Sequence, residues 1–292
     1  MTILRIILVM GLAGAAVAAA PSDSWYRGAT PCPVLDGRAD PVYTLDAGLV
    51  MPADVANGDV LSLLEWDIRS DLLYFREVLL GDLDIRLHFQ TLIPLDGGGL
   101  HLPDQLLAVA VDNRWTWRYV NDTAFQWQFA PGFYGSFDAL RLESLTVPMT
   151  FTGIKTLDST LAAVAGVAVR PGFEHVFLPV AGVVWQPGPA FRLEALVPEA
   201  RVIYYPVSAW AVDARWAWES MTYQLPDDRA DRRRVTFASY RLSLGVTREL
   251  NPEFRVGGEL GLLNGREIDF GRGGDVDVDP TLYLRLGIGG AF

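Results

Sequence analysis

The sequence lacks the features of several common protein classes. Its one cysteine, Cys32, excludes a disulfide within the chain. After its first 20 residues, no segment reaches the ~18 consecutive apolar residues of a transmembrane helix, which excludes a helical membrane protein. Only three histidines occur, and none has the spacing of a zinc site with another His, Cys or carboxylate. The formal net charge of −11 argues against a nucleic-acid partner.

The N-terminus has the pattern of a secretory signal peptide. Residues 1–20, MTILRIILVMGLAGAAVAAA, combine Arg5, a short apolar run and small residues. Ala16 and Ala18 favour cleavage between residues 18 and 19, with 20/21 as the alternative. We therefore expect a signal peptide over residues 1–18, a loose Pro- and Gly-containing arm over 19–41, and one folded domain over 42–292. The mature protein is expected to be exported.

Apolar and polar residues alternate in many segments of the expected domain. WAVDARWAW, residues 210–218, places Trp and Val at every second position and Asp213 and Arg215 between them. LDIRLHFQTLI, residues 83–93, and FRVGGELGLL, residues 254–263, repeat this pattern. Such alternation predicts half-buried β-strands. Residues 60–79 fit either a strand or an amphipathic helix, and the neighbouring strands favour the strand.

The connections between the expected strands alternate between short and long. Residues 120–122, 186–189, 205–208 and 250–253 are short turns, whereas 95–104, 135–143, 225–234 and 264–279 are long polar loops; the short 197–200 is the exception on the long side. Short turns on one side and long loops on the other are typical of transmembrane barrels. The fold prediction is therefore all-β: a closed, antiparallel, up-and-down transmembrane barrel of 14 strands, with 12 as the lower count.

The two faces of these strands have opposite character. A sheet that closes on itself satisfies its backbone hydrogen bonds, so one face can meet lipid and the other an interior that holds charges. Both signs of charge fall on the expected inner face, which fits either a narrow wet channel or an interior closed by ion pairs. The expected lumen residues are Asp84, Arg86, His88, Arg192, Glu194, Asp213, Arg215, Glu219, Arg255, Glu259 and Arg285.

Aromatic residues lie near the ends of several expected strands, beside short turns. Aromatic rings collect at membrane interfaces, where their amphipathic bodies fit best. The alternative is that these rings pack the core of a soluble, exported β-sandwich. The expected girdle consists of Trp115, Trp117, Tyr119, Trp185, Tyr204 and Tyr205.

The last residues, DPTLYLRLGIGGAF, continue the alternation to a final aromatic residue. Leu284, Leu286, Ile288 and Phe292 resemble the C-terminal assembly signal of bacterial outer-membrane barrels, although Gly290 stands where that signal usually has a bulky residue. This resemblance implies a location in the outer membrane and insertion by the barrel-assembly machinery. It implies no activity.

A longer segment resembles a family of uncharacterised bacterial outer-membrane barrels. The similarity covers residues 183–218, through Trp185-Gln186-Pro187, Arg192-Leu193 and Pro198, and then Arg201, Tyr204 and Pro206. It supports the barrel fold. The family has no activity that the resemblance could carry to this chain.

Few residues have the character of a catalytic or metal site. His88, beside Asp84 and Arg86 on the expected inner face, is the best candidate for a general base. No GxSxG-type motif places a serine, so His88 is more simply a polar wall residue. Asp275, Asp277 and Asp279 offer oxygen ligands for Ca²⁺, but the EF-hand pattern is incomplete and a solvated acidic loop is the simpler reading. The arginines of 228–234 are candidates for contacts with lipopolysaccharide phosphates.

These observations favour an outer-membrane pore for passive transport of small solutes. The first alternative is a structural or surface-binding barrel with a closed lumen. The second is a lipid-modifying barrel enzyme, although we do not expect an enzyme. We expect no cofactor, and outer-membrane lipid, lipopolysaccharide and the assembly machinery as partners. The sequence indicates neither the solute nor the oligomeric state.

Overall fold

The chain folds almost entirely into β-strands. The computed structural model describes residues 42–56, 58–100, 102–119, 122–137, 144–226, 234–251, 253–271 and 274–290. Within these ranges the strands form one hydrogen-bonded sheet, and one short 3-10 helix, η1 (Gly98–Leu100), interrupts them. No helix in the described ranges is long and apolar enough to cross a membrane. The predicted signal peptide and arm, residues 1–41, lie outside the described residues.

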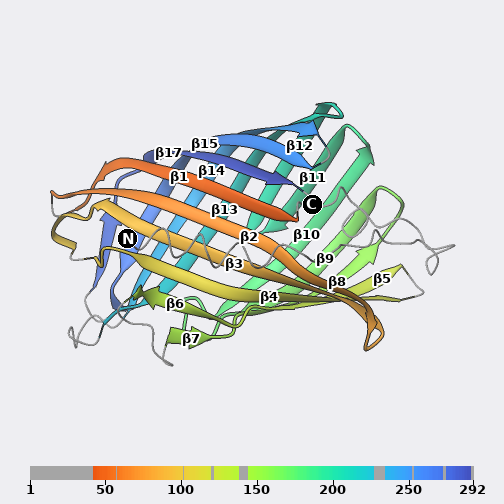
Figure 1. Ribbon diagram of the computed structural model, residues 1–292, viewed down its shortest axis with the longest axis horizontal. Helices are drawn as coiled ribbons and strands as arrows, with labels where there is room; N and C mark the ends of the chain where they lie inside the picture. The colour runs from red at the N-terminus through yellow and green to blue at the C-terminus, as the bar shows by residue number, and fades with distance from the viewer. Residues whose placement is uncertain are drawn as a thin grey trace.

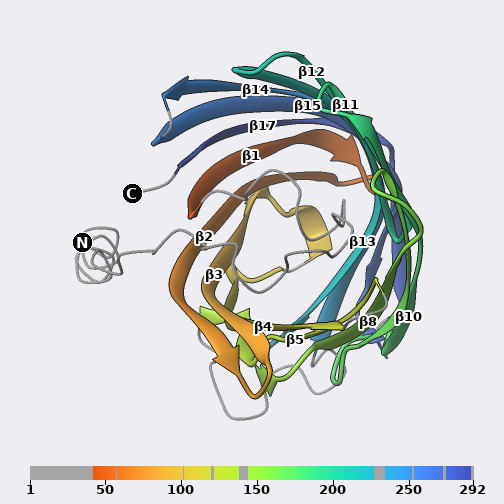
Figure 2. The same ribbon diagram turned by 90° about the vertical axis from the view of Figure 1, so that its right-hand side faces the viewer.

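Fourteen strands close into an antiparallel barrel (Figures 1 and 2). They pair in chain order, and the first and last strands pair with each other from Tyr43↔Gly290 to Val50↔Tyr283. This confirms the predicted fold and strand number. The strands of the ring are β1 (Tyr43–Asp54), β2 (Val60–Val78), β3 (Gly81–Asp96), β4 (Leu106–Tyr119), β5 (Thr123–Phe129), β8 (Met149–Thr156), β9 (Leu161–Val169), β10 (Phe177–Gly188), β11 (Phe191–Val197), β12 (Glu199–Val207), β13 (Trp210–Gln224), β14 (Arg234–Asn251), β15 (Phe254–Asp269) and β17 (Thr281–Gly290).

Three shorter strands extend the wall at one end: β6 (Gly132–Ser136), β7 (Leu145–Thr146) and β16 (Asp275–Val278). β4 pairs with β5 near its C-terminal end and with β6 near its N-terminal end. Pro131 separates β5 from β6, and Pro148 separates β7 from β8. Proline has no backbone N–H to donate, so the ladder is interrupted at both points.

Connections of different length lie at the two ends of the barrel. The turn end has the connections 79–80, 120–122, 157–160, 189–190, 208–209 and 252–253. The loop end has 55–59, 97–105, 137–144, 170–176 and 225–233, together with the single residue Pro198 between β11 and β12. This confirms the predicted alternation and its one exception.

Two sequence-based expectations about single segments have clear outcomes. Residues 60–79 form a strand over Val60–Val78, held between β1 and β3. The expectation of one polar loop over 264–279 is wrong in part. β15 continues to Asp269 and forms a hairpin with β16, because Ile268 and Val278 bury their side chains against the interior.

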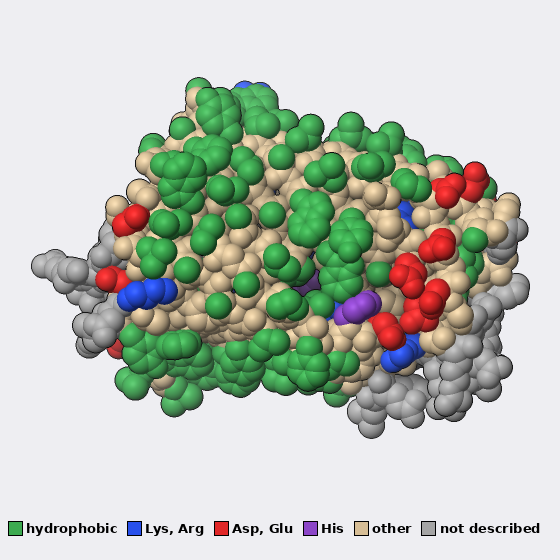
Figure 3. All heavy atoms as spheres, turned by 180° about the vertical axis from the view of Figure 1, so that it is seen from behind, with side chains coloured by type: hydrophobic (Ala, Val, Ile, Leu, Met, Phe, Trp, Pro, Cys, Tyr) green, Lys and Arg blue, Asp and Glu red, His purple; other side chains and the backbone are tan. Residues whose placement is uncertain are grey.

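The outer face of the barrel is apolar. Strand side chains alternate between the two faces of a sheet, and Leu242, Leu244, Leu260, Leu284 and Leu286 are all well exposed. Figure 3 shows apolar side chains spread over the middle of the molecule, with acidic side chains gathered near one end. The predicted polarity of the two faces therefore holds for these strands.

An apolar cluster, here called the loop-end core, fills the interior near the loop end. Leu61, Leu106, Tyr223 and Val235 lie within it with 0% exposure. Its members come from strands on facing sides of the ring, so their side chains meet across the interior. The remaining members are Val50, Ala53, Val55, Leu63, Leu92, Leu100, Ala108, Ala110, Tyr134, Phe173, Leu225, Leu263, Ile268, Phe270, Val278 and Tyr283.

Candidate functional site

Charged side chains line the interior of the barrel below the loop-end core. β13 shows how the strand pattern places them. Asp213 is only 8% exposed, whereas Trp216, which has the opposite parity, is 39% exposed on the outer face. Pairing with an opposite charge offsets the loss of hydration of a charge on the inner face.

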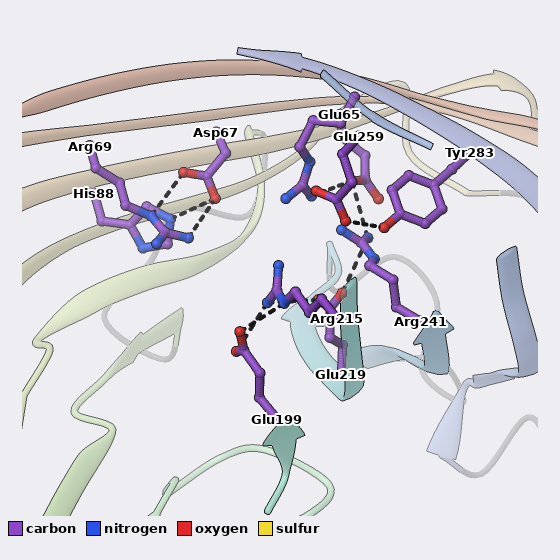
Figure 4. A network of polar contacts seen from close by, with 11 residues as sticks. Glu65, Asp67, Arg69, His88, Glu199, Arg215, Glu219, Arg241, Glu259 and Tyr283 are labelled. Atoms are coloured by element: carbon purple, nitrogen blue, oxygen red, sulfur yellow. Dashed lines mark hydrogen bonds and ion pairs between the residues drawn. The ribbon is translucent and has the colours of Figure 1, made fainter. Parts of the chain in front are cut away.

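The first group of polar contacts joins β2 and β3 (Figure 4). Arg69 makes a bidentate contact with the Asp67 carboxylate, and its Nε and Nη2 atoms each donate to one oxygen at 3.0 Å. His88 Nε2 lies 3.3 Å from Asp67 Oδ2. The two-pronged contact fixes the plane of the carboxylate and aligns it for His88.

A second group lies at the β3–β4 side of the interior. Arg86 lies between two carboxylates, with Nε 2.8 Å from Asp71 and Nη2 3.0 Å from Asp84. Arg114 Nη2 also contacts Asp84, at 2.6 Å. Each charge in this group therefore has a partner of opposite sign on a neighbouring strand.

A central group brings together side chains from five strands, β2, β13, β14, β15 and β17. Glu65 Oε2 lies 3.5 Å from Arg241 Nη2 and 3.3 Å from Arg285 Nη2. Arg241 Nη2 is also 3.2 Å from Glu219. The Tyr283 hydroxyl donates to Glu259, as Figure 4 shows. This group borders the loop-end core, to which Tyr283 belongs.

A fourth group links β11, β12 and β13. Arg192 Nε lies 2.6 Å from Glu194. Arg201 Nη2 lies 3.0 Å from Asp213. Arg215 Nε lies 2.8 Å from Glu199, and its Nη2 is 3.6 Å from Glu219, which connects this group with the central one.

Water reaches part of this charged section. The side chain of Arg69 is 57% exposed and that of Glu199 is 48% exposed, whereas that of Arg241 is 4% exposed. Arg241 lies against the loop-end core, with its guanidinium over the Tyr283 ring. The interior therefore passes from partly solvated charges to buried charges to the mainly apolar loop-end core, among which Arg266 is also buried.

The structure brings most of the predicted lumen residues into these groups. Arg255, on the inner parity of β15, is the one outside the contacts described above. Several members of these groups were not predicted, although the sequence around them indicates their position. Tyr240, Leu242 and Leu244 alternate with Arg241 and Ser243, and this pattern places Arg241 on the inner face. Residues 60–79 fitted either a strand or a helix, so no inner-face residues were predicted within them. The members not predicted are Glu65, Asp67, Arg69, Asp71, Arg114, Glu199, Arg201, Arg241 and Tyr283.

The predicted aromatic girdle divides between the two faces. Trp115 and Trp117 stack with ring centroids 5.9 Å apart, and their indole N–H groups donate to Val78 O and Leu79 O at the turn end. Trp185, Tyr119 and Tyr204 are exposed. Tyr205 follows Tyr204 directly in β12, so it has the inner parity and is a correction to that prediction.

The predicted assembly signal is described only in part. Leu284, Leu286 and Ile288 lie exposed on the outer face of β17. Phe292 lies outside the described residues. The role of these residues in assembly stays a prediction.

The two described histidines both have polar partners. His88 contacts Asp67, and His175 Nδ1 lies 3.3 Å from Ser220 Oγ. Ser220 is only 3% exposed, and no carboxylate of the described ranges contacts His175. A buried hydroxyl without an acid to orient the imidazole does not make a hydrolytic triad. His101 lies outside the described residues.

No described group of three or more His, Cys, Asp or Glu side chains could hold a metal ion. Asp275 and Asp277 lie in β16, where they face Asp269 and Glu267 of β15. Asp279 follows β16 and its N–H donates to Asp54 O. Of the arginine run 228–234, only Arg234 is described, and it pairs with Glu174 at 2.5 Å.

No protein-family model matches the chain. No curated protein matches it either. Among solved structures, the chain is similar to an outer-membrane channel from Pseudomonas putida F1, with 12% identity, a TM-score of 0.46, and coverage of 87% of this chain and 97% of that one. It is also similar to the NanC porin, with 9% identity, a TM-score of 0.40, and coverage of 85% and 100%. The KdgM porin gives 7% identity, a TM-score of 0.38, and coverage of 85% and 99%. At these values the likeness carries no argument about solute or mechanism.

Proposed function

We propose that the protein is a channel for small solutes in a bacterial outer membrane, and that the loop-end core closes it in this conformation. The observation that carries the proposal is the order of layers inside the barrel. Solvated charges such as Arg69 and Glu199 give way to the buried Arg241 and then to side chains with no exposure, such as Leu61.

The apolar layer acts as a barrier to ions and polar solutes. A hydrophobic constriction excludes water, and an ion that crosses it must give up its hydration without new partners. Among the described residues the layer is made of wall side chains such as Leu106 and Tyr223, so its opening would require these strands to move. A closed resting state distinguishes this channel from a general porin.

Single-channel recordings of the refolded protein in planar bilayers test the proposal. The wild type is expected to give a quiet baseline with brief openings. Leu106→Ser places a hydroxyl in the apolar layer, which lowers the barrier to water and is expected to raise the open fraction clearly. Leu244→Ser on the outer face is the control and should behave like the wild type.

A second function is favoured by the same ion pairs. Contacts of 2.6–3.6 Å between arginines and carboxylates join inner-face side chains, and a network of this kind would keep the interior closed if it persisted. The barrel would then be structural, or would bind a surface partner through its loops. Complete silence of the wild type and of Leu106→Ser at all voltages, with heat-modifiable gel migration showing a folded barrel, would reject the channel and leave this alternative.

A further inference from the structure

The barrel wall has a gap between strands at the loop end. β13 pairs with β14 along its whole length, but on its other edge β12 pairs only as far as Ala217↔Glu199. The next strand contact on that edge is the parallel pair Gln224↔Gly135 with β6. Within the described ranges, residues 218–223 therefore have no strand partner on this edge.

The loop 170–176 lies across this gap. Arg170 Nη1 donates to Ser220 O at 2.8 Å, and Glu174 N donates to Thr222 Oγ1 at 3.1 Å. Phe173 is 3% exposed and packs edge-on against Tyr134, with ring centroids 5.2 Å apart. Side-chain contacts thus replace the missing strand ladder here, and they leave space between them.

A cavity of about 390 Å³ lies between this loop, β6, β7 and β13. Leu145, Val147 and Met149 form one side, and Phe173 and Tyr134 form its inner limit against the loop-end core. Leu145 is 45% exposed, so the cavity borders the apolar outer face. Its size is near the lower limit for small-molecule sites, enough for one chain but not for a multi-chain lipid.

A guanidinium with one unused donor lies against Phe173, a residue that lines this cavity. Arg170 Nη2 is buried and has no hydrogen-bond partner. Its guanidinium carbon lies 5.1 Å from the centre of the Phe173 ring, which lines the cavity. A buried cationic donor without a partner is costly, and an anionic group would satisfy it.

We propose that this side cavity binds a fatty acid taken from the membrane, with its chain between the loop 170–176 and β7 and its carboxylate on Arg170. The apolar lining suits the chain, and the free donor suits the carboxylate. The site lies in the wall and not on the axial path. It therefore goes beyond the proposed channel, and its test does not depend on conductance.

Photolabelling of the full refolded chain in phosphatidylcholine vesicles tests this site. The probe is dodecanoic acid with a diazirine on its terminal carbon, and adducts are located by peptide mass spectrometry. We expect adducts concentrated on residues 145–149 and 171–173. Excess unlabelled dodecanoic acid should reduce labelling of these residues and leave any labelling of the apolar outer face unchanged.

Three variants test the cavity and its charge. Val147→Trp fills the cavity and should reduce its labelling about tenfold, which corresponds to ~1.4 kcal/mol of binding. Val167→Trp on the exposed face of β9 is the matched control and should leave labelling unchanged. Arg170→Gln should reduce labelling by the acid but not by the corresponding diazirine alcohol, because only the acid carries a charge.

Three results would contradict a fatty-acid site in this cavity. The proposal would be overturned if adducts were spread evenly over the apolar outer face. It would also be overturned if unlabelled acid did not reduce the adducts at residues 145–149. Equal labelling of Val147→Trp and the wild type would contradict it as well. Because competition is measured on the wild type, the proposal can fail even if a variant does not fold.

Discussion

The guanidinium carbon of Arg241 lies 4.5 Å from the centre of the Tyr283 ring. These residues belong to β14 and β17, which lie on either side of β15. The face of the guanidinium meets the ring, while its Nη2 atom meets Glu65 and Glu219. The pair therefore joins the charged section of the interior to the loop-end core.

Loss of the Arg241 charge should destabilise the barrel strongly. Arg241→Gln removes the buried cation that contacts both Glu65 and Glu219 and leaves them only Arg285 and Arg215. Removal of one member of a buried pair costs about 3–5 kcal/mol. Urea titration of the vesicle-inserted protein, followed by tryptophan fluorescence, measures the loss. Arg234→Gln breaks the exposed contact with Glu174 and should cost less than ~1 kcal/mol. Equal losses of unfolding free energy in the two variants would show that the ion pairs of Arg241 stabilise the barrel no more than an exposed pair does.

The depth of a residue on the outer face should set the cost of a charge there. Leu244 is 67% exposed in the middle of β14, and Leu250 is 50% exposed near the turn end. Leu244→Arg should cost ~2–4 kcal/mol and Leu250→Arg only ~0–1 kcal/mol, because the bilayer centre solvates charge least. The same urea titration compares them. A larger cost at Leu250 would contradict the placement of the barrel in the membrane.

Gly182 should be intolerant of any side chain. Its φ is +151°, and an added Cβ would lie 1.9 Å from Ala195 O of the neighbouring strand. Gly182→Ala must push β10 away from β11, with an expected cost of ~2 kcal/mol or more. Gly188→Ala in the same strand meets nothing within 4 Å and is the matched control. Similar yields of refolded barrel and similar urea midpoints for both variants would count against the close approach.

Asp158 should make one turn sensitive to acid. Its Oδ1 accepts hydrogen bonds from Thr160 Oγ1 and Thr160 N, both at 2.7 Å, and from Leu161 N at 2.9 Å. These bonds, that of the Thr160 hydroxyl foremost, hold the pKa of Asp158 below its ordinary value. The stabilisation is therefore present above the unfolded-state pKa and is lost as the pH falls through the folded-state value. Urea midpoints of the wild type and Asp158→Ala should converge below about pH 4; a gap that does not narrow would refute the assignment.

The strand pattern was readable where one face is uniformly apolar. Trp210, Val212 and Trp216 identify the outer face of β13, and so they predict that Asp213 and Arg215 lie inside. In residues 60–79 the apolar residues also fit a helical stripe. Only pairing with β1 and β3 separates the two possibilities, because pairing is a contact between distant segments.

The loop-end core and the side cavity had no local signal. Phe173 lies in a loop, and its burial depends on the gap beside β13, which arises where β12 stops pairing. Tyr205 was assigned to the girdle from its place at a strand end beside a short turn, although its parity already placed it opposite Tyr204. That error was avoidable, whereas the position of Phe173 was not.

The sequence by itself determined that alternate side chains of each strand face opposite sides, and it predicted a closed sheet on the premise that the strands span a membrane. A period of two fixes the face of a residue, and unpaired backbone groups are intolerable in lipid. Only the tertiary structure decided which charges meet and where the interior becomes dry. Glu65 contacts Arg241 and Arg285, which are 176 and 220 residues away. The two-residue alternation along a strand does not give a residue's position along the barrel axis. The register between neighbouring strands sets that position and so brings these residues together.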